Sequence, residues 1–240
     1  MRNQKKMNKD SISSHLLELR SRIIKVLICL GIFFIAGIPF ASEIYSIAAS
    51  PLLSILPEGS SMIATQVTSP FMAPIKLVLF AALLVSMPYL FYEIWMFMSP
   101  GLYKDEKKFV APLMISTILL FAAGIAFAYF VVCPIIFKFF IASAPNSIQV
   151  MTDISQYLNF IIRLVFAFGI AFEIPVATFL LIKSDIVKKD SLIKLRPYLI
   201  ILFFVIGMLL TPPDIFSQLF LAIPMWILFE LGLLVSRDKP

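Results

Sequence analysis

The chain has 240 residues, of which 60% are hydrophobic and only 14% are charged, and its mean hydropathy is +0.98. Charged residues make up about a quarter of an average soluble domain, so this composition excludes an ordinary soluble fold and predicts a polytopic helical membrane protein. The net charge of +6 does not indicate nucleic-acid binding, because the basic residues gather in loops on one side of the predicted membrane.

Six apolar segments read as membrane spans in chain order, and the linkers between them are short. We therefore expect a single integral membrane domain over residues 1–240, with a cytoplasmic amphipathic segment at 1–22, a six-span bundle at 23–235 and a cytoplasmic tail at 236–240. The spans are Ile23–Ala41, Phe71–Met98, Ala111–Phe130 with an extension toward Phe140, Tyr157–Ile182, Pro197–Leu210 and Ile215–Val235.

The fifth predicted span is too short for an ordinary bilayer. Its 14 residues reach about 21 Å as a helix, whereas a hydrocarbon core is about 30 Å thick. It ends in Thr211-Pro212-Pro213-Asp214, which predicts a tight turn before the sixth span. Prolines also interrupt the other spans, and each one removes a backbone donor and can bend its helix. The sequence therefore predicts an all-α bundle that is bent and cupped.

The distribution of charge predicts the orientation. Of the 20 basic residues, 17 lie in the N-terminal segment, in the loops after the second and fourth spans, and in the tail. The loops on the opposite side carry Glu43, Glu58, Asp153 and Asp214. The positive-inside rule then places both termini in the cytoplasm, with the lipid bilayer between the two sets of loops.

Two motifs lie on the predicted cytoplasmic side. The first, Ser14–Arg22, alternates leucines with charges that include Glu18, and it reads most simply as an interfacial helix whose arginines contact lipid headgroups. In the second, Tyr89, Glu93 and Phe97 stand four residues apart, so they share a helix face that runs toward Glu106.

Glu106 has two interpretations. It can pair locally with the lysines of its own loop, which contributes little energy. It can also receive a cationic ligand, with Phe97 as an apolar neighbour, and arginine is then the natural guest because carboxylates pair bidentately with guanidinium.

Glu173 lies inside the apolar run 160–182, beside Pro175. An ionisable group at that depth costs at least about 2.5–3.5 kcal/mol on insertion scales, so it is normally functional and faces protein or a wet cavity. It could contact a partner's helix or an inserting peptide, serve as the proton site of a proton-coupled small-solute transporter, or form an internal hydrogen bond at the Pro175 bend. No internal repeat is visible, which disfavours the transporter.

The sequence contains no enzyme-like constellation. It has no glycine-rich phosphate loop, no nucleophile with a nearby base and no metal-ligand spacing. His15 is the only histidine, and Cys29 and Cys133 both lie alone in apolar runs. We therefore expect no catalytic activity, no cofactor, no metal and no disulfide. A purely structural scaffold stays open as a third function, although it would not need carboxylates on its cytoplasmic face.

Five segments together resemble the TatC family, the polytopic subunit of the twin-arginine (Sec-independent) protein translocase. They occur in the family's order between His15 and Arg237, and they read HLLELRSR, SPFMAPIKL, PGLYKDEKK, FAFGIAFEIPV and RPYLIILFFVIGMLLTPPDIFSQLFLAIPMWILFELG. The resemblance implies six transmembrane helices in a cupped bundle with short fifth and sixth helices and cytoplasmic termini.

The resemblance also implies a function. Members of the family sit in the bacterial inner membrane, bind the twin-arginine signal peptides of folded proteins and recruit the single-span proteins TatA and TatB. Transport is driven by the proton-motive force, and self-association is expected. On this likeness Glu18, Phe97 and Glu106 would bind the signal peptide, while Glu173 and Asp214 would form intramembrane or partner-contacting polar sites. From its residues alone, Asp214 reads as a cap of the sixth span.

Overall fold

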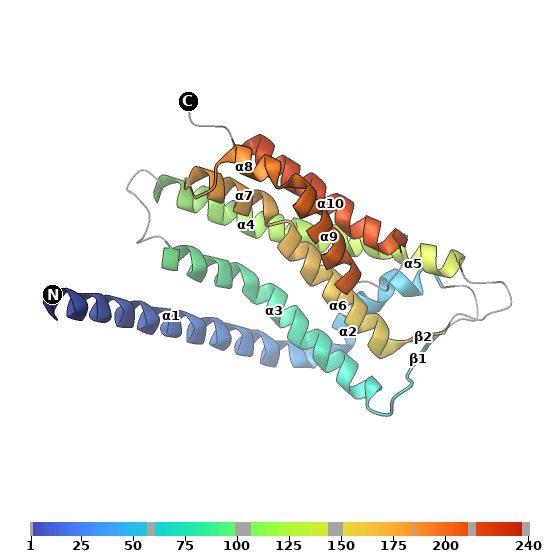
Figure 1. The fold of residues 1–240 in the computed structure, drawn as a ribbon. Coiled ribbons are helices and arrows are strands. Elements are labelled where there is room, and N and C mark those ends of the chain that lie inside the picture. Colours follow the sequence, from blue (N-terminus) through green and yellow to red (C-terminus); the bar gives the residue numbers. More distant parts are fainter. Residues whose placement is uncertain are drawn as a thin grey trace.

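Helices make up nearly all of the structure (Figure 1). It is a computed structural model that describes residues 2–56, 61–98, 107–143, 151–184, 186–210 and 215–236, with side chains from residue 15 onward except at 98 and 107–110. The helices are α1 (Arg2–Gly37), α2 (Ala41–Leu53), α3 (Ser69–Met98), α4 (Lys107–Phe127), α5 (Cys133–Ala142), α6 (Ile154–Ala171), α7 (Ile174–Lys183), α8 (Lys189–Lys194), α9 (Arg196–Leu210) and α10 (Ile215–Val235).

Among the described residues, five helical stretches are long and apolar enough to cross a membrane, and α9 is a shorter apolar helix. The stretches are His15–Leu53, Ser69–Phe97, Ala111–Ala142, Ile154–Lys183 and Ile215–Val235. With α9 they account for all six predicted spans, and they include the extension of the third, so the predicted all-α polytopic fold is confirmed. The 15 residues of α9 reach only about 22 Å, and the 21 residues of α10 make it the shortest of the five long stretches.

The first span continues beyond the boundary expected from the sequence. Pro39 lacks a backbone N–H, and the helix tightens there into a 3-10 turn, Ile38–Phe40, before it resumes as α2. The inner face of α2 buries Ala49 and Leu52 against neighbouring helices. The apolar residues after Ala41 therefore form a second, packed helix rather than a loop.

The fourth span is divided at Phe172-Glu173, where α6 ends and α7 begins. The N–H of Glu173 donates to the carbonyl of Ile170, three residues back rather than four, so the last turn of α6 is tightened. Pro175 lies in the first turn of α7, where its missing N–H leaves no hydrogen bond unmade. The bend expected at this proline is thus a break between two helices, and Glu173 lies at it.

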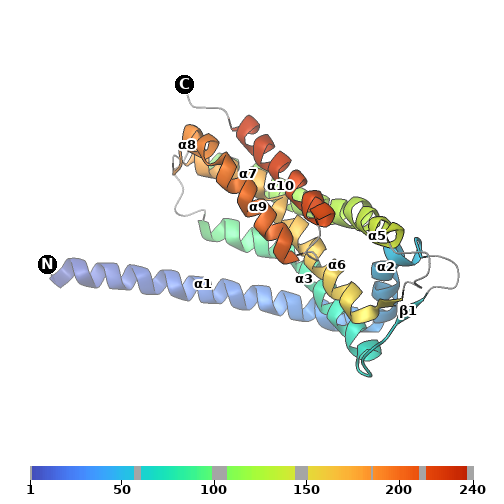
Figure 2. The same ribbon diagram turned by 45° about the vertical axis from the view of Figure 1, so that its right-hand side comes forward.

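The helices pack into two hydrophobic cores that share α6 and α10. The larger core joins α2, α3, α5 and α6 with Leu221 of α10, and the smaller one joins α8, α9 and α10 with Ala171 of α6. Outside both cores, α1 packs mainly along α3, and the two lie side by side in Figures 1 and 2. Helix α1 begins and α10 ends at the same end of the bundle, which we call the terminal end.

Gly124 permits the close approach of α4 to α6. A Cβ at this position would lie 2.5 Å from the carbonyl oxygen of Phe168, which belongs to the backbone and cannot swing away. In lipid, where no hydrophobic effect drives helices together, such small-residue contacts are a main source of helix association. Gly31 on α1 is a natural contrast, because a Cβ there would meet nothing within 4 Å.

We expect Gly124→Ala to lower the stability of the bundle by about 1–3 kcal/mol, the usual penalty for overpacking. Gly31→Ala should leave stability unchanged or raise it, because alanine is favoured over glycine in a helix by about 1 kcal/mol. Thermal unfolding of the two purified variants in detergent measures the difference. Equal unfolding midpoints for the two would show that α4 and α6 do not depend on this contact.

Asp153 ties together two segments far apart in the chain, at the end of the bundle opposite to the terminal end. Its Oδ1 accepts the N–H of Gln156 at 2.9 Å and so caps α6. Its Oδ2 accepts the hydroxyl and the N–H of Thr65, at 2.6 and 3.0 Å. Beside it, the two-residue strands β1 (Met62–Ile63) and β2 (Thr152–Asp153) pair in parallel. These hydrogen bonds and the strand pair hold the segment before α3 against the start of α6.

The hydroxyl of Thr65, followed by the N–H groups of Gln156 and Thr65, lowers the pKa of Asp153 below its ordinary value. A lowered pKa in the folded state contributes stability above the unfolded value, about 3.9, and this contribution disappears as pH falls through the folded value. Asp153→Asn should therefore unfold at a lower temperature than the wild type near pH 7, and the difference should shrink below about pH 4. A difference that stays constant with pH would rule out the carboxylate as its source.

Candidate functional site

A network of charged side chains joins α1 to α3 near the terminal end. Arg22 on α1 donates from Nη1 to Glu93 Oε2 on α3 at 2.7 Å. The same guanidinium donates from Nε and Nη2 to Glu18 Oε1, one turn earlier on α1, at 3.2 and 2.7 Å. The hydroxyl of Tyr89 donates to the other oxygen of Glu93 at 2.7 Å. One guanidinium thus bridges two carboxylates from two helices.

Burial differs sharply across this network. The side chain of Glu93 is only 7% exposed and that of Arg22 is 18% exposed, whereas Glu18 is 38% exposed. Removing one partner of a buried ion pair is strongly destabilising, by about 3–5 kcal/mol, because it leaves an uncompensated charge. Two carboxylates share one guanidinium, Lys25 adds a further positive charge near Glu93, and the more accessible of the two carboxylates is Glu18.

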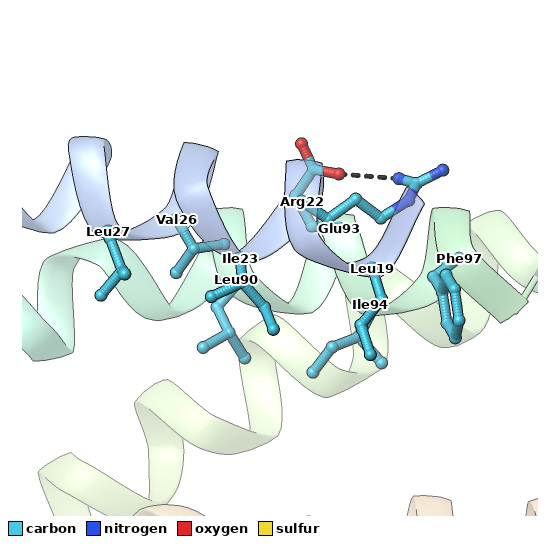
Figure 3. A pocket seen from close by; sticks show the side chains of 9 residues that line it. All are labelled: Leu19, Arg22, Ile23, Val26, Leu27, Leu90, Glu93, Ile94 and Phe97. Carbon is cyan, nitrogen blue, oxygen red and sulfur yellow. Dashed lines mark hydrogen bonds and ion pairs between the residues drawn. The ribbon is translucent and has the colours of Figure 1, made fainter. Parts of the chain in front are cut away.

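An apolar groove of about 380 Å³ runs along α1 and α3 beside this network (Figure 3). Nine side chains line it, and only two of them, Arg22 and Glu93, carry charge; the others are Leu19, Ile23, Val26, Leu27, Leu90, Ile94 and Phe97. Figure 3 shows the ion pair and Phe97 toward one end of the groove and Leu27 at the other. The site therefore offers charge at one end and an apolar surface along the rest.

Two of the three residues expected to bind a signal peptide lie near this groove. Phe97 lines it directly, and its ring meets the ring of His15 edge-on at a centroid distance of 5.7 Å. His15 Nδ1 in turn lies 3.8 Å from Glu18 Oε2. Glu18 and Phe97 are therefore linked through His15, although they are 79 positions apart in the chain. Glu106 lies outside the described residues.

The structure corrects one interpretation and adds one residue. Arg22 is not an arginine directed at lipid headgroups, because its guanidinium is held by Glu18 and Glu93. The sequence placed Glu93 on the face of Tyr89 and Phe97, which the Tyr89 bond bears out, but offered no reason to pair it with a residue 71 positions away. The feature of the sequence that could have singled out Glu93 is a glutamate inside a predicted span, five residues before its end.

Glu173 lies at the break between α6 and α7, and the hydroxyl of Thr117 on α4 faces its carboxylate. Within the described part of the chain, neither Glu173 Oε1 nor Thr117 Oγ1 makes a hydrogen bond of normal geometry, although both atoms are buried. The ten residues of α7 separate Glu173 by about 15 Å from the end of this span, close to the middle of a bilayer. Glu173 as a whole is only partly buried, and an unsatisfied carboxylate at that depth is unusual. Asp214 lies outside the described residues.

These features define a polytopic helical membrane protein with an acidic, arginine-bridged site at one end and an isolated carboxylate near its centre. The chain belongs to the TatC family: the family model described as Sec-independent protein translocase protein (TatC) matches residues 14–224. The chain is 54% identical to the Sec-independent protein translocase protein TatC of Azotobacter chroococcum mcd 1, over 95% of this chain and 91% of that protein. It is 49% identical to TatC of Escherichia coli strain K12, over 93% and 87%.

Solved structures support the same family and fold. Two crystal structures of the twin-arginine translocase receptor TatC, one of them in DDM, superimpose with TM-scores of 0.83 and 0.85 at 34% identity. They cover 92% and 93% of this chain, which in turn covers 97% and 99% of theirs. The predicted family and fold class are therefore confirmed.

Proposed function

We propose that this protein is the receptor subunit of a twin-arginine protein translocase, and that the groove between α1 and α3 receives the signal peptide. The observation that carries this proposal is the partly exposed carboxylate of Glu18 at one end of an apolar groove. A signal peptide has the complementary order, a positively charged segment followed by an apolar one. The arginines would pair with carboxylates at the terminal end, and the apolar segment would lie along Ile94 and Leu90.

Each predicted binding residue has a distinct part in this proposal. Glu18 accepts a guanidinium, because carboxylates and guanidinium groups form strong, charge-assisted pairs. Phe97 provides an apolar face beside the charge, and Glu106 adds a second acidic group from the loop that follows α3. Both matched crystal structures are of a twin-arginine translocase receptor, and this likeness supports the same ligand class.

The proposed localisation, orientation and partners rest on the distribution of charge and on the family. The protein would lie in the bacterial inner membrane with both termini in the cytoplasm, because 17 of its 20 basic residues lie in the sequence segments predicted to be cytoplasmic. Its partners would be single-span TatA-like and TatB-like proteins, folded cargo and further copies of itself. The proton-coupled small-solute transporter, the alternative weighed from the sequence, gains no support from the relatives, which are named as a protein translocase component.

The receptor role predicts that neutralising Glu18 weakens peptide binding. A hydrogen bond to a charged group contributes about 1.5–3 kcal/mol, so Glu18→Gln should lower the affinity for a twin-arginine peptide by about one to two factors of ten. Glu106→Gln should act in the same direction. Anisotropy of a labelled peptide bound to the purified protein measures the change, with a twin-lysine peptide for comparison.

Glu43→Gln is the matched control, because it removes the same charge from an exposed position on α2, far from the groove. It should bind the peptide as the wild type does. Equal affinity for the arginine and lysine peptides in the wild type, or unchanged affinity in both Glu18→Gln and Glu106→Gln, would contradict the receptor role.

We further propose that Glu173 contacts a partner's transmembrane helix. This is supported by its buried oxygen atom, which has no hydrogen bond within the described residues. Glu173→Gln and Glu173→Ala should then accumulate normally and bind signal peptide, yet crosslink poorly to TatA-like or TatB-like helices and transport slowly. The alternative is a structural role at the break before Pro175, in which case Glu173→Ala would lower the amount of folded protein while Glu173→Gln would not. Normal transport by a folded Glu173→Ala protein would refute the contact.

A further inference from the structure

We propose that Glu18 and Glu93 together form a guanidinium site that the protein's own Arg22 occupies when no ligand is bound, and that a signal-peptide arginine enters by exchanging with it. This inference rests on the proposed receptor function and names the step by which the receptor recognises arginine. It also assigns to Glu93 a direct role in specificity, beyond the residues expected from the sequence.

The geometry of Arg22 is that of a bound ligand. Its planar fork reaches carboxylates on two different helices, with one bond of 2.7 Å to Glu93 and bonds of 3.2 and 2.7 Å to Glu18. Guanidinium suits such a bridge because its donors point in fixed directions, whereas a lysine ammonium is a compact point charge that cannot reproduce the fork. A site that holds one arginine in this way has the shape and charge to hold another.

The hydrogen bonds that the carboxylate oxygens of Glu93 and Glu18 already make favour exchange with Arg22 over binding beside it. Both oxygens of Glu93 already accept hydrogen bonds, one from Tyr89 and one from Arg22, and its side chain is almost fully buried. Glu18 is the exposed partner, and its Oε2 has only the distant Nδ1 of His15 nearby, at 3.8 Å, within the described part of the chain. An incoming guanidinium can therefore meet Glu18 first, but it can reach Glu93 only if Arg22 leaves.

Exchange also explains how the protein tolerates a buried carboxylate in the empty state. Glu93 would be an uncompensated charge without a cation beside it, and such a charge is strongly destabilising. Lys25 is a second positive charge near Glu93, but Arg22 is the cation that donates a hydrogen bond to its carboxylate until a second guanidinium takes over that contact. A ligand group that forms fewer bonds than Arg22 does competes with it less well, so the internal arginine favours binding of arginine over lysine.

Arg22→Lys tests the exchange while keeping a positive charge beside Glu93. We expect it to bind a twin-arginine peptide about tenfold more tightly than the wild type, because the internal competitor loses its fork. The twin-lysine peptide should gain much less. Arg22→Gln removes the fork and the charge together and should change affinity in the same direction. Lys194→Gln makes the same charge change at an exposed position on α8 and should leave both affinities unchanged.

A second substitution asks whether the peptide contacts Glu93. In the Arg22→Lys background, Glu93→Gln should remove the gain and lower affinity by about tenfold. If the peptide binds beside Arg22 and never reaches Glu93, this substitution will have no effect. Thermal unfolding and size-exclusion profiles confirm that each variant compared is folded, and Arg22→Lys decides the question if Arg22→Gln does not fold.

The outcomes separate this inference from the receptor role. A wild type that prefers the arginine peptide, combined with Arg22→Lys affinity equal to or weaker than wild type, would overturn the exchange and leave Arg22 as a strut between α1 and α3. A wild type without any arginine preference would contradict the proposed function and the exchange with it.

Discussion

The contact between Arg22 and Glu93 is the interaction on which the proposed receptor site depends. Helix α1 lies outside both hydrophobic cores and packs mainly on α3. Lipid tails are as apolar as leucine, so burying leucines between two helices in a membrane gains little free energy by itself. While no ligand is bound, a charge-assisted bond between the helices therefore fixes their relative position more firmly than the surrounding apolar contacts can. The walls of the groove, Glu18 and Phe97 all take their places from that register.

Elsewhere in the bundle, close contact between helix backbones, rather than a charged pair, fixes how neighbouring helices pack. Where α4 meets α6 and where α10 meets α7, the helices approach until a single Cβ would collide with backbone atoms, at Gly124 and Gly232 respectively. Close packing of this kind replaces the hydrophobic effect inside a membrane. The carboxylate of Glu173 lies between these two contacts, at the break before Pro175. A rigid frame with one exposed carboxylate at its end and one unsatisfied carboxylate near its centre is well suited to bind two different partners.

Much of this arrangement could be predicted from the sequence, for definite reasons. Span positions follow from hydropathy, because the bilayer leaves helices as the only option for long apolar segments. The short α9 and the break at Pro175 follow from segment length and from the missing N–H of proline. Glu173 could be singled out because a carboxylate at that depth is unusual. Phe97 was indicated by its helix face and by the family likeness, and Glu18 by the family likeness alone.

What could not be predicted is the pairing between elements. No periodicity relates Arg22 to Glu93 or Thr65 to Asp153, because these contacts depend on how helices and loops pack in three dimensions. Arg22 was interpreted as a headgroup contact, since most arginines at membrane boundaries have that role. The sequence predicts that the first span ends at Ala41, because a membrane helix is expected to stop at the bilayer surface. It gives no sign that the chain turns at Pro39 and continues as the 13-residue helix α2.

Site-specific photocrosslinking tests the central claim, that a twin-arginine signal peptide docks between α1 and α3. A photoreactive side chain at Ile94, an exposed position in the groove, should form an adduct with the apolar segment of a bound twin-arginine peptide. The adduct should be lost with a twin-lysine peptide or in the Glu18→Gln protein. The same probe at Tyr198, exposed on α9 at the terminal end, should give none. Equal adducts from both positions, or none from Ile94 while the peptide is bound, would contradict the account.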